Sequence, residues 1–269
     1  MATDIDDNKL AVFCDFENVA LGVRDARYPR FNMSPILERL LLKGSIVVKK
    51  AYCDWERYKE FKSSMHEASF ELIEIPHVRQ SGKNSADIRM VVDALDLCYT
   101  KSHVDTFVIV SGDSDFSPLV SKLRENAKTV IGVGVKNSSS DLLINNCDEF
   151  IFYDDLVRQE ERTKRKRRPR AKKPDAKEAS AGKEDDPKQE AIELVLETAD
   201  ALHSERGAEE TVWGSMIKQA LKRRRPEFNE RNFGFRSFSE LLEEARERGY
   251  LTLEHDERSG GYLVRIASG

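Results

Sequence analysis

Apolar runs alternate with segments of helical periodicity from Leu10 to about Leu156. Most of the runs are apolar without interruption, which is typical of strands that are covered by helices on both faces. They are LAVFC, SIVVKKAYC, FELIEIP, TFVIVS, TVIGVGV and EFIFY. The pattern predicts an α/β domain in which a parallel sheet is sandwiched between helices.

Three of the intervening helices have a recognisable start, because serine and proline favour the first turn. The starts are Ser34-Pro35, Ser85 and Ser117-Pro118. The helix that begins near Ser85 also has an apolar stripe, which we expect to pack against the sheet. The stripe consists of Ile88, Val91, Val92 and Leu95.

The rest of the chain divides at a change in composition. Residues 158–186 are almost free of aliphatic side chains, so they cannot form a core and are predicted to be a flexible linker. Three helical patterns and a hairpin that turns at Ser259-Gly260-Gly261 follow, and they predict a small winged-helix domain. The predicted divisions are a disordered N-terminus at 1–9, an α/β domain at 10–157, the linker, and the winged helix at 187–267.

The formal net charge of −4 conceals a strongly basic segment. Residues 158–177 carry eleven Lys/Arg and three Asp/Glu, which gives +8 there and −12 in the remainder. Such a segment can attract a polyanion or serve as a solvated spacer, and charge alone favours neither.

The four cysteines show no CxxC spacing, which favours free thiols in a reducing cytoplasm. The N-terminal residues MATDIDDNK lack an apolar segment, and no stretch approaches the roughly 20 apolar residues of a spanning helix. We therefore expect neither secretion nor membrane insertion.

Acidic residues follow the first and fourth predicted strands and open a helix between them. Asp15 ends the first strand, Asp87 lies in the first turn of the helix, and Asp113 and Asp115 follow the fourth strand. With a strand order of 3-2-1-4-5 the first and fourth strands are neighbours, and their carboxyl ends form the switch point where ligands bind. Carboxylates that converge there suggest a Mg²⁺ or Mn²⁺ site for phosphodiester hydrolysis.

Other residues near these acids have competing interpretations. Asn18 can donate to a phosphate or hold a carboxylate in place, whereas Asp115 can cap the turn before Ser117 instead of binding metal. Asp141 is expected to be a helix cap, and Asp93 projects to another side of its helix than Asp87. The DSDFS segment is also similar to the nucleophile motif of haloacid dehalogenase-like phosphatases, but that family places it after the first strand.

The motifs FCDFEN, GKNSADIRMVVD and VIVSGDSDFSPLV together resemble the NYN domain of the PIN-like ribonuclease superfamily, in its bacterial branch. The resemblance covers about Leu10 to Tyr153 and implies a PIN-like, Rossmann-like parallel sheet sandwiched by helices. It implies that Asp15, Asp87 and Asp113 are the main metal ligands, Asp115 a fourth acid and Asn18 an active-site support. The segment around FGFRSFSELL resembles the LOTUS domain, also called OST-HTH, which implies RNA binding.

Basic residues in two regions are the predicted RNA contacts. Arg79, Lys83 and Arg89 belong to the polar loop before Asp87 and to the following turn, where solvated charge is an equal alternative. A second group lies along and beyond the second helix of the winged-helix domain, where phosphate contacts, a soluble basic face or a protein partner are all open. This group comprises Lys218, Lys222, Arg223, Arg224, Arg225 and Arg236.

Taken together, the sequence predicts a metal-dependent ribonuclease, acting endonucleolytically, with a C-terminal RNA-binding domain. The alternative is a non-catalytic RNA-binding or regulatory adaptor in which the acids bind a metal without turnover or cap structure. Aromatic residues such as Trp55, Tyr58 and Phe61 recur at helical spacing, so they are expected to be core rather than a platform for bases.

Overall fold

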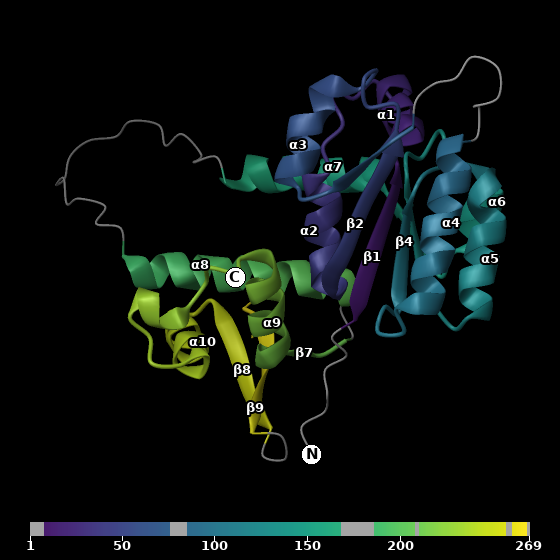
Figure 1. Cartoon of the computed structure of the whole chain (residues 1–269). Coiled ribbons are helices and arrows are strands. Elements are labelled where there is room, and N and C mark those ends of the chain that lie inside the picture. The colour runs from purple at the N-terminus through teal and green to yellow at the C-terminus, as the bar shows by residue number, and fades with distance from the viewer. Residues whose placement is uncertain (1–7, 76–84, 168–185, 208–209, 257–259, 268–269) are drawn as a thin grey trace, which may run out of the picture. The chain divides into compact units, whose positions relative to one another are not determined.

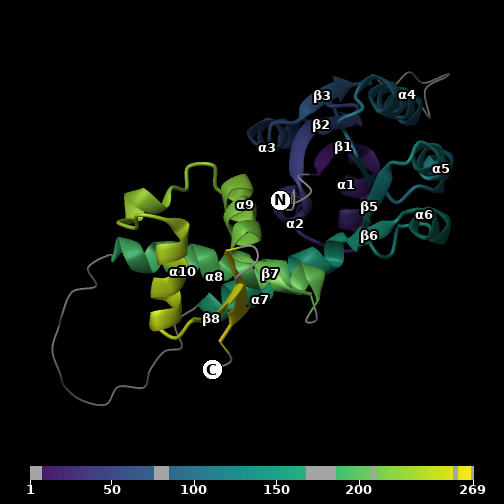
Figure 2. The same ribbon diagram turned by 90° about the horizontal axis from the view of Figure 1, so that it is seen from below.

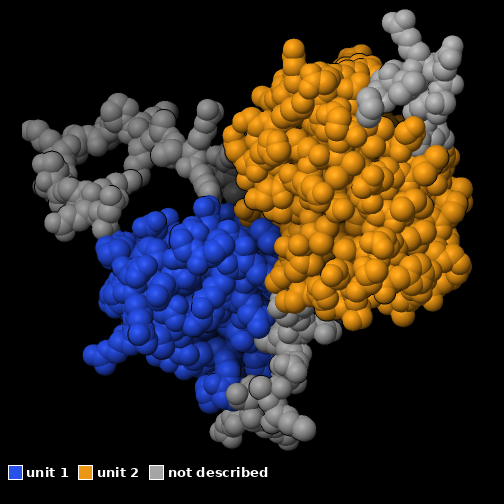
Figure 3. All heavy atoms as spheres, viewed as in Figure 1, with its two compact units in different colours: residues 1–7, 41–44, 170–269 blue, residues 8–40, 45–169 orange. Residues whose placement is uncertain are grey.

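The computed structural model describes residues 8–75, 85–167, 186–207, 210–256 and 260–267, with 161–167 described by their backbone alone. These residues belong to two compact units (Figure 3). One consists mainly of residues 8–40 and 45–169, and the other mainly of residues 170–269. Within the described parts of both units, no helix is sufficiently long and apolar to cross a membrane.

The first unit is built on a six-stranded sheet whose strands are all parallel (Figure 1). The strands are β1 (Lys9–Asp15), β2 (Ser45–Cys53), β3 (Glu71–Glu74), β4 (Thr106–Val110), β5 (Thr129–Gly134) and β6 (Glu149–Phe152). Their order is β3-β2-β1-β4-β5-β6. The predicted strands and their order are therefore confirmed, and β1 lies beside β4.

Helices cover both faces of this sheet (Figure 2). One face is covered by α1 (Phe16–Asp25), α2 (Ser34–Lys43), α3 (Lys62–Glu67) and α7 (Tyr153–Arg167). The other is covered by α4 (Ser85–Thr100), α5 (Ser117–Glu125) and α6 (Asp141–Asn146). Two short 3-10 helices, η1 (Lys59–Phe61) and η2 (Ser114–Phe116), complete the unit.

Successive side chains along a strand contact the helices on alternate faces of the sheet. In β1, Val12 and Cys14 belong to the core beneath α1 and α2, whereas Ala11 and Phe13 belong to the core beneath α4 and α5. Because successive side chains point to opposite faces, Asp15 continues the row of Phe13. Ser111 stands in the same relation to Ile109 in β4, so both polar side chains lie on the α4 side.

Aromatic residues fix the start of α1. Phe16 is fully buried and packs against Trp55, Tyr58 and Phe61 with ring-centroid distances of 4.9, 5.6 and 5.1 Å. The prediction that these rings form core is confirmed. Their packing also fixes the turn between Asp15 and α1.

The predicted apolar stripe of α4 is wrong in part. The residues buried against the sheet are Met90, Ala94 and Cys98, while Ile88 and Val92 are 63% and 56% exposed. This helix carries apolar residues on two sides, and the small side chains of Ala94 and Cys98 allow close approach to the sheet. The spacing of the apolar residues predicts an apolar stripe on the helix, but it does not show which of the two apolar sides faces the sheet.

Several predicted helix caps differ from the structure. Ser34 is the first residue of α2 rather than its cap. Ser117 is the first residue of α5 rather than its cap, because the 3-10 turn η2 runs directly into the helix. In α6 the cap is Ser140, whose side chain accepts a hydrogen bond from the backbone N–H of Leu142, and Asp141 is the first helical residue. A serine cap followed by an acid uses both the hydrogen bond and the helix dipole.

The predicted linker begins inside a helix. Helix α7 continues to Arg167, ten residues into the range predicted as linker. Its Glu, Arg, Lys and Gln residues have high intrinsic helix propensity, which explains helical structure without an apolar core. Residues 168–185 lie outside the described part.

The second unit contains three longer helices and a small antiparallel sheet. The elements are α8 (Pro187–Arg206), β7 (Val212–Trp213), α9 (Gly214–Arg224), η3 (Glu230–Phe233), α10 (Phe238–Glu247), β8 (Leu251–Asp256) and β9 (Gly261–Ile266). The strand order is β7-β9-β8. Three helices and a hairpin are as predicted; β7 is an additional strand, and Ser259 of the predicted turn lies outside the described residues.

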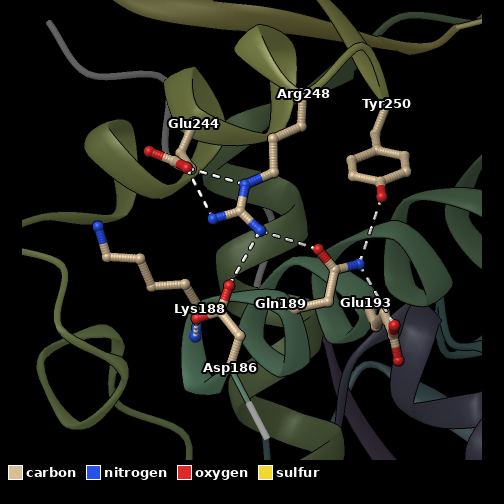
Figure 4. Close-up of polar contacts among 7 residues, drawn as sticks. All are labelled: Asp186, Lys188, Gln189, Glu193, Glu244, Arg248 and Tyr250. Atoms are coloured by element: carbon tan, nitrogen blue, oxygen red, sulfur yellow. Dashed lines mark hydrogen bonds and ion pairs between the residues drawn. The ribbon is translucent and has the colours of Figure 1, made fainter. Parts of the chain in front are cut away.

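Paired charges join the ends of this unit's elements (Figure 4). The guanidinium of Arg248 donates to Glu244 Oε1 at 2.8 Å, to Gln189 Oε1 at 3.0 Å and to Asp186 Oδ2 at 3.2 Å. Asp186 also caps α8 by accepting from the N–H of Lys188 at 3.1 Å. The start of α8 is thereby tied to the segment that follows α10.

Candidate active site at the carboxyl edge of the sheet

Asp15 is the most deeply buried acid at the carboxyl edge of the sheet. It ends β1 and caps α1, accepting from the N–H of Asn18 at 3.3 Å. It is 7% exposed, and its other carboxylate oxygen accepts from Ser111 Oγ at 3.0 Å. The hydrogen bond from Ser111 joins the ends of the adjacent strands β1 and β4, as the predicted switch point requires.

Asn18 supports the loop after β4. Its side-chain oxygen accepts from the backbone N–H of Gly112 at 2.8 Å. Because the partner is an N–H donor, the amide must present its oxygen there, which points its NH₂ group elsewhere. Asn18 thus holds the loop after β4 in place, while its support of an active site and its donation to a phosphate stay predictions.

Gly112 is required by the close approach of the β5–α6 loop. A Cβ atom at this position would lie 2.5 Å from the carbonyl oxygen of Ser138 and 2.9 Å from the Cα of Ser139. The carbonyl of Gly112 also accepts from the N–H of Ser140 at 2.9 Å. The loop after β4 is therefore clamped between α1 and α6.

Asp113 and Asp115 follow this clamp. The N–H of Asp113 donates to Ser111 Oγ at 3.2 Å, and Asp113 caps η2 by accepting from the N–H of Asp115 at 3.0 Å. Asp113 is half-buried and Asp115 is exposed. The side chain that caps this turn is thus that of Asp113, not that of Asp115 as the alternative interpretation expected. Metal binding by either acid stays a prediction.

Burial and neighbouring acids raise the pKa values of Asp15 and Asp87. Burial, and then the negative charge of Asp87, raise the pKa of Asp15 to about 7, and Asp113 adds to the effect. The pKa of Asp87 is raised by burial and then by Asp113, Asp115 and Glu17. Asp87 therefore lies within electrostatic reach of each of the other three predicted acids, and Asp15 within reach of Asp87 and Asp113.

Glu17 is an acid of this edge that the sequence analysis missed. It lies in the first turn of α1, and its carboxylate accepts from Arg57 Nη1 at 2.8 Å. The guanidinium of Arg57 lies in turn 5.7 Å from the ring centre of Tyr58. The only signal in the sequence is that Glu17 stands between Asp15 and Asn18 in one motif.

Asp93 belongs to another network on the same helix as Asp87. It accepts from Tyr52 Oη at 2.9 Å, from Lys50 Nζ at 3.3 Å and from Arg89 Nε at 3.0 Å. Although burial alone would raise the pKa of Asp93, these donors hold it below its ordinary value. Asp93 thus fastens α4 to β2, and Arg89 is engaged there as well.

The donor set is of the kind that a divalent cation takes, because carboxylate oxygens are hard ligands and their mutual repulsion calls for a positive charge. Within the described residues, however, no three His, Cys, Asp or Glu side chains are already arranged around a position that could hold a metal. The acids fit Mg²⁺ or Mn²⁺ in chemistry and location. Asp141 is exposed on α6 and is not among the charges named as raising the pKa of Asp15 or Asp87.

The predicted RNA contacts of the second unit fall into two groups. Lys218 pairs with Glu230 at 2.8 Å and Arg224 with Glu197 at 3.6 Å, while Arg223 is half-buried. The other members are exposed and form no ion pair with any described residue; they are Lys222, Arg225 and Arg236. Arg79 and Lys83 lie outside the described residues.

A family model of the NYN domain matches residues 9–154, just over half of the chain. The chain belongs to the NYN domain family. A model of the OST-HTH/LOTUS domain matches residues 185–259. The resemblance predicted from the three acid motifs and from the FGFRSFSELL segment is therefore confirmed in both parts and in this order.

Two individual proteins are similar to part of this chain. The uncharacterised protein MJ0482 of Methanocaldococcus jannaschii is 28% identical over 120 residues, which is 45% of this chain and 47% of that protein. The chain thus matches about half the length of this curated relative. The crystal structure of VPA0982, a protein of unknown function from Vibrio parahaemolyticus, has a TM-score of 0.51 at 28% identity, covering 58% of this chain and 98% of the other.

NYN domains belong to a superfamily of PIN-like nucleases, and OST-HTH/LOTUS domains are RNA-binding modules. The two matches support a nuclease that carries an RNA-binding domain. The acids Asp15, Asp87, Asp113 and Asp115 are then the natural candidates for the nuclease site.

Proposed function

We propose that this NYN protein is a metal-dependent ribonuclease that cuts RNA endonucleolytically, with its C-terminal domain binding the substrate. The observation that carries the proposal is Asp15, a carboxylate 7% exposed that faces Asp87 and Asp113 and carries no compensating cation among the described residues. A stable fold gains nothing from such repulsion. The arrangement is expected where a cationic ligand is bound.

Asp15, Asp87 and Asp113 would hold the metal, with Asp115 as a fourth acid. A bound Mg²⁺ or Mn²⁺ supplies an activated water and stabilises the charge that develops on the attacking and leaving oxygens. The ligands would be kept in place by neighbouring polar groups. Ser111 orients Asp15, and Asn18 holds Gly112 and with it the loop that carries Asp113.

Exposed cations of the OST-HTH/LOTUS domain would bind the RNA backbone. Lys222, Arg225 and Arg236 are the candidates, because Lys218 and Arg224 already pair with acids. A tethered binding domain raises the concentration of captured RNA near the catalytic edge. The free thiols of all four cysteines suit the reducing cytoplasm that the sequence predicts.

A cleavage panel tests the proposal. Single-stranded, duplex and structured RNA and DNA would be incubated with the full chain, with Mg²⁺ or Mn²⁺ supplied or chelated. We expect metal-dependent cutting of RNA that is lost in Asp15→Asn and in Asp113→Asn. Asp25→Asn is the matched control, because Asp25 is an exposed acid at the other end of α1.

The same panel separates the proposal from the adaptor alternative. A chain that binds RNA and never cuts it, with any metal and substrate, would be an adaptor. Cutting that survives both Asp15→Asn and Asp113→Asn would place the catalytic site elsewhere. Far-UV circular dichroism of each variant confirms that the fold is intact.

A further inference from the structure

Helix α4 presents an apolar face to solvent that the catalytic site does not use. Ile88, Val92 and Tyr99 are 63%, 56% and 64% exposed, and they account for three of the seven large apolar side chains with high exposure in the described residues. Leu95 lies between them and is half-buried. An exposed patch of this kind on one helix is typical of an interaction surface.

The spacing of this face is that of a helix-pairing seam. Ile88, Val92, Leu95 and Tyr99 follow one another at intervals of four, three and four residues, which places them in a single row along the helix. Met90, Ala94 and Cys98 occupy the opposite side and pack against the sheet. Ile88, Val92 and Tyr99 are therefore presented outward by a helix that is firmly attached to the domain, while Leu95 also packs partly against the core.

Charges beside the row are self-complementary. Arg89 and Asp96 are exposed on the same flank, and they lie on either side of the middle of the row. In an antiparallel pair about a twofold axis, Ile88 meets Tyr99 of the second copy and Val92 meets its Leu95. Arg89 of each copy then lies beside Asp96 of the other, which forms two equivalent ion pairs.

Both charges are able to make this contact. Arg89 donates through Nε to Asp93, and its two Nη groups have no partner among the described residues. A guanidinium has five N–H donors, so it can keep this bond and add another. The carboxylate of Asp96 forms no ion pair with the described residues.

We propose that the α4 face, defined as Ile88, Val92, Leu95 and Tyr99 with Arg89 and Asp96, binds a second copy of this chain in an antiparallel twofold pair. Helix α4 has 16 residues and a length of about 24 Å, so the seam is short and the dimer dissociates on dilution. Asp87 lies in the first turn of α4, and the pairing therefore places the two acid edges at opposite ends of the helix pair.

Sedimentation equilibrium of the full chain tests the dimer across low-micromolar to sub-millimolar concentrations. We expect the wild type to approach twice the mass of one chain as concentration rises, and Val92→Glu to remain at the mass of one chain throughout. Leu142→Glu is the matched control and should behave as wild type, because Leu142 is 57% exposed on α6 and lies outside the face. A monomeric wild type, or a dimer retained by Val92→Glu, would overturn the proposal.

A charge exchange distinguishes a second copy from any other partner. Arg89→Glu and Asp96→Lys should each weaken the dimer at least several-fold, because each places like charges across the seam. The double variant should regain the wild-type affinity, because the acid at position 89 of each copy then lies beside the base at position 96 of the other. A double variant no better than either single variant would contradict the twofold pairing.

Discussion

The charged groups at the edge of the NYN sheet and those that pair in the OST-HTH/LOTUS domain are arranged in opposite ways. In the OST-HTH/LOTUS domain, acids and bases are paired: Arg248 is held by three acceptors, and Lys218 by Glu230. Burial alone would raise the pKa of Glu230, but Lys218 holds it below its ordinary value. At the edge of the NYN sheet, the pKa of Asp15 is raised instead.

This difference separates structural charge from functional charge. Paired groups in the C-terminal domain fasten α8 to the end of α10, and the hydrogen bonds to Glu244 and Asp186 raise the pKa of Arg248, which favours its ionised form. The acids of the NYN edge are held together against repulsion by Ser111, Asn18 and the close contact at Gly112. Strain of this kind is expected where a protein is organised for a ligand.

The largest effect is expected from Asp87→Asn. Asp87 feels the charges of Asp113, Asp115 and Glu17, so its removal dismantles the cluster at its middle. We expect the rate of metal-dependent RNA cleavage to fall on the order of 10³-fold, equivalent to about 4 kcal/mol of barrier. Asp141→Asn is the control at an exposed acid of α6, and an equal loss in both variants would contradict the assignment.

The pH dependence of the unfolding free energy should reveal the raised pKa of Asp15 at the NYN edge. A carboxyl whose pKa is about 7 when folded and 3.8 when unfolded binds its proton more tightly in the folded state. The contribution of Asp15 to metal-free stability is therefore fully present below about pH 3.8 and is lost as the pH rises through 7, by at most ~4 kcal/mol. Urea unfolding in the presence of a chelator measures this, with Asp15→Asn as the variant that should lose most of the slope.

Glycine substitutions compare the packing of the two parts. Gly112→Ala meets backbone atoms at 2.5 and 2.9 Å, which cannot move aside, and should cost about 1–3 kcal/mol of unfolding free energy. Gly214→Ala in α9 meets the end of the Leu242 side chain at 2.7 Å, which can rotate. We expect a smaller cost there, and equal effects in urea titrations would show that the loop after β4 is not tightly clamped.

The smallest effects concern the basic residues of α9. Lys222→Gln should weaken RNA binding a few-fold and reduce the salt slope of the affinity by about 1, because one phosphate contact is lost. Lys218→Gln should instead destabilise the C-terminal domain with the slope unchanged, since Glu230 loses its partner. Reversed behaviour of these two variants would remove the distinction between paired and available cations.

The strands and their order follow from the sequence because continuous apolar runs and their spacing are local signals. From them the convergence of Asp15, Asp87 and Asp113 at one edge could be predicted. The exposure of Ile88 and Val92 could not, because α4 has two apolar sides and the choice depends on the shape of the sheet. The roles of Glu17 and Arg57 depend on a contact forty residues apart in the chain, which no local pattern reveals.

The central claim is that the acids at the NYN edge repel one another until a divalent cation joins them. Thermal unfolding of the wild type and Asp15→Asn at pH 8, with chelator and with Mn²⁺, tests it most directly. Asparagine keeps the acceptor for the N–H of Asn18, and Ser111 can rotate its hydroxyl to accept. We expect Asp15→Asn to melt above the wild type in chelator, and Mn²⁺ to raise only the wild type. A variant that melts below the wild type in chelator, or gains equally from Mn²⁺, would contradict this account.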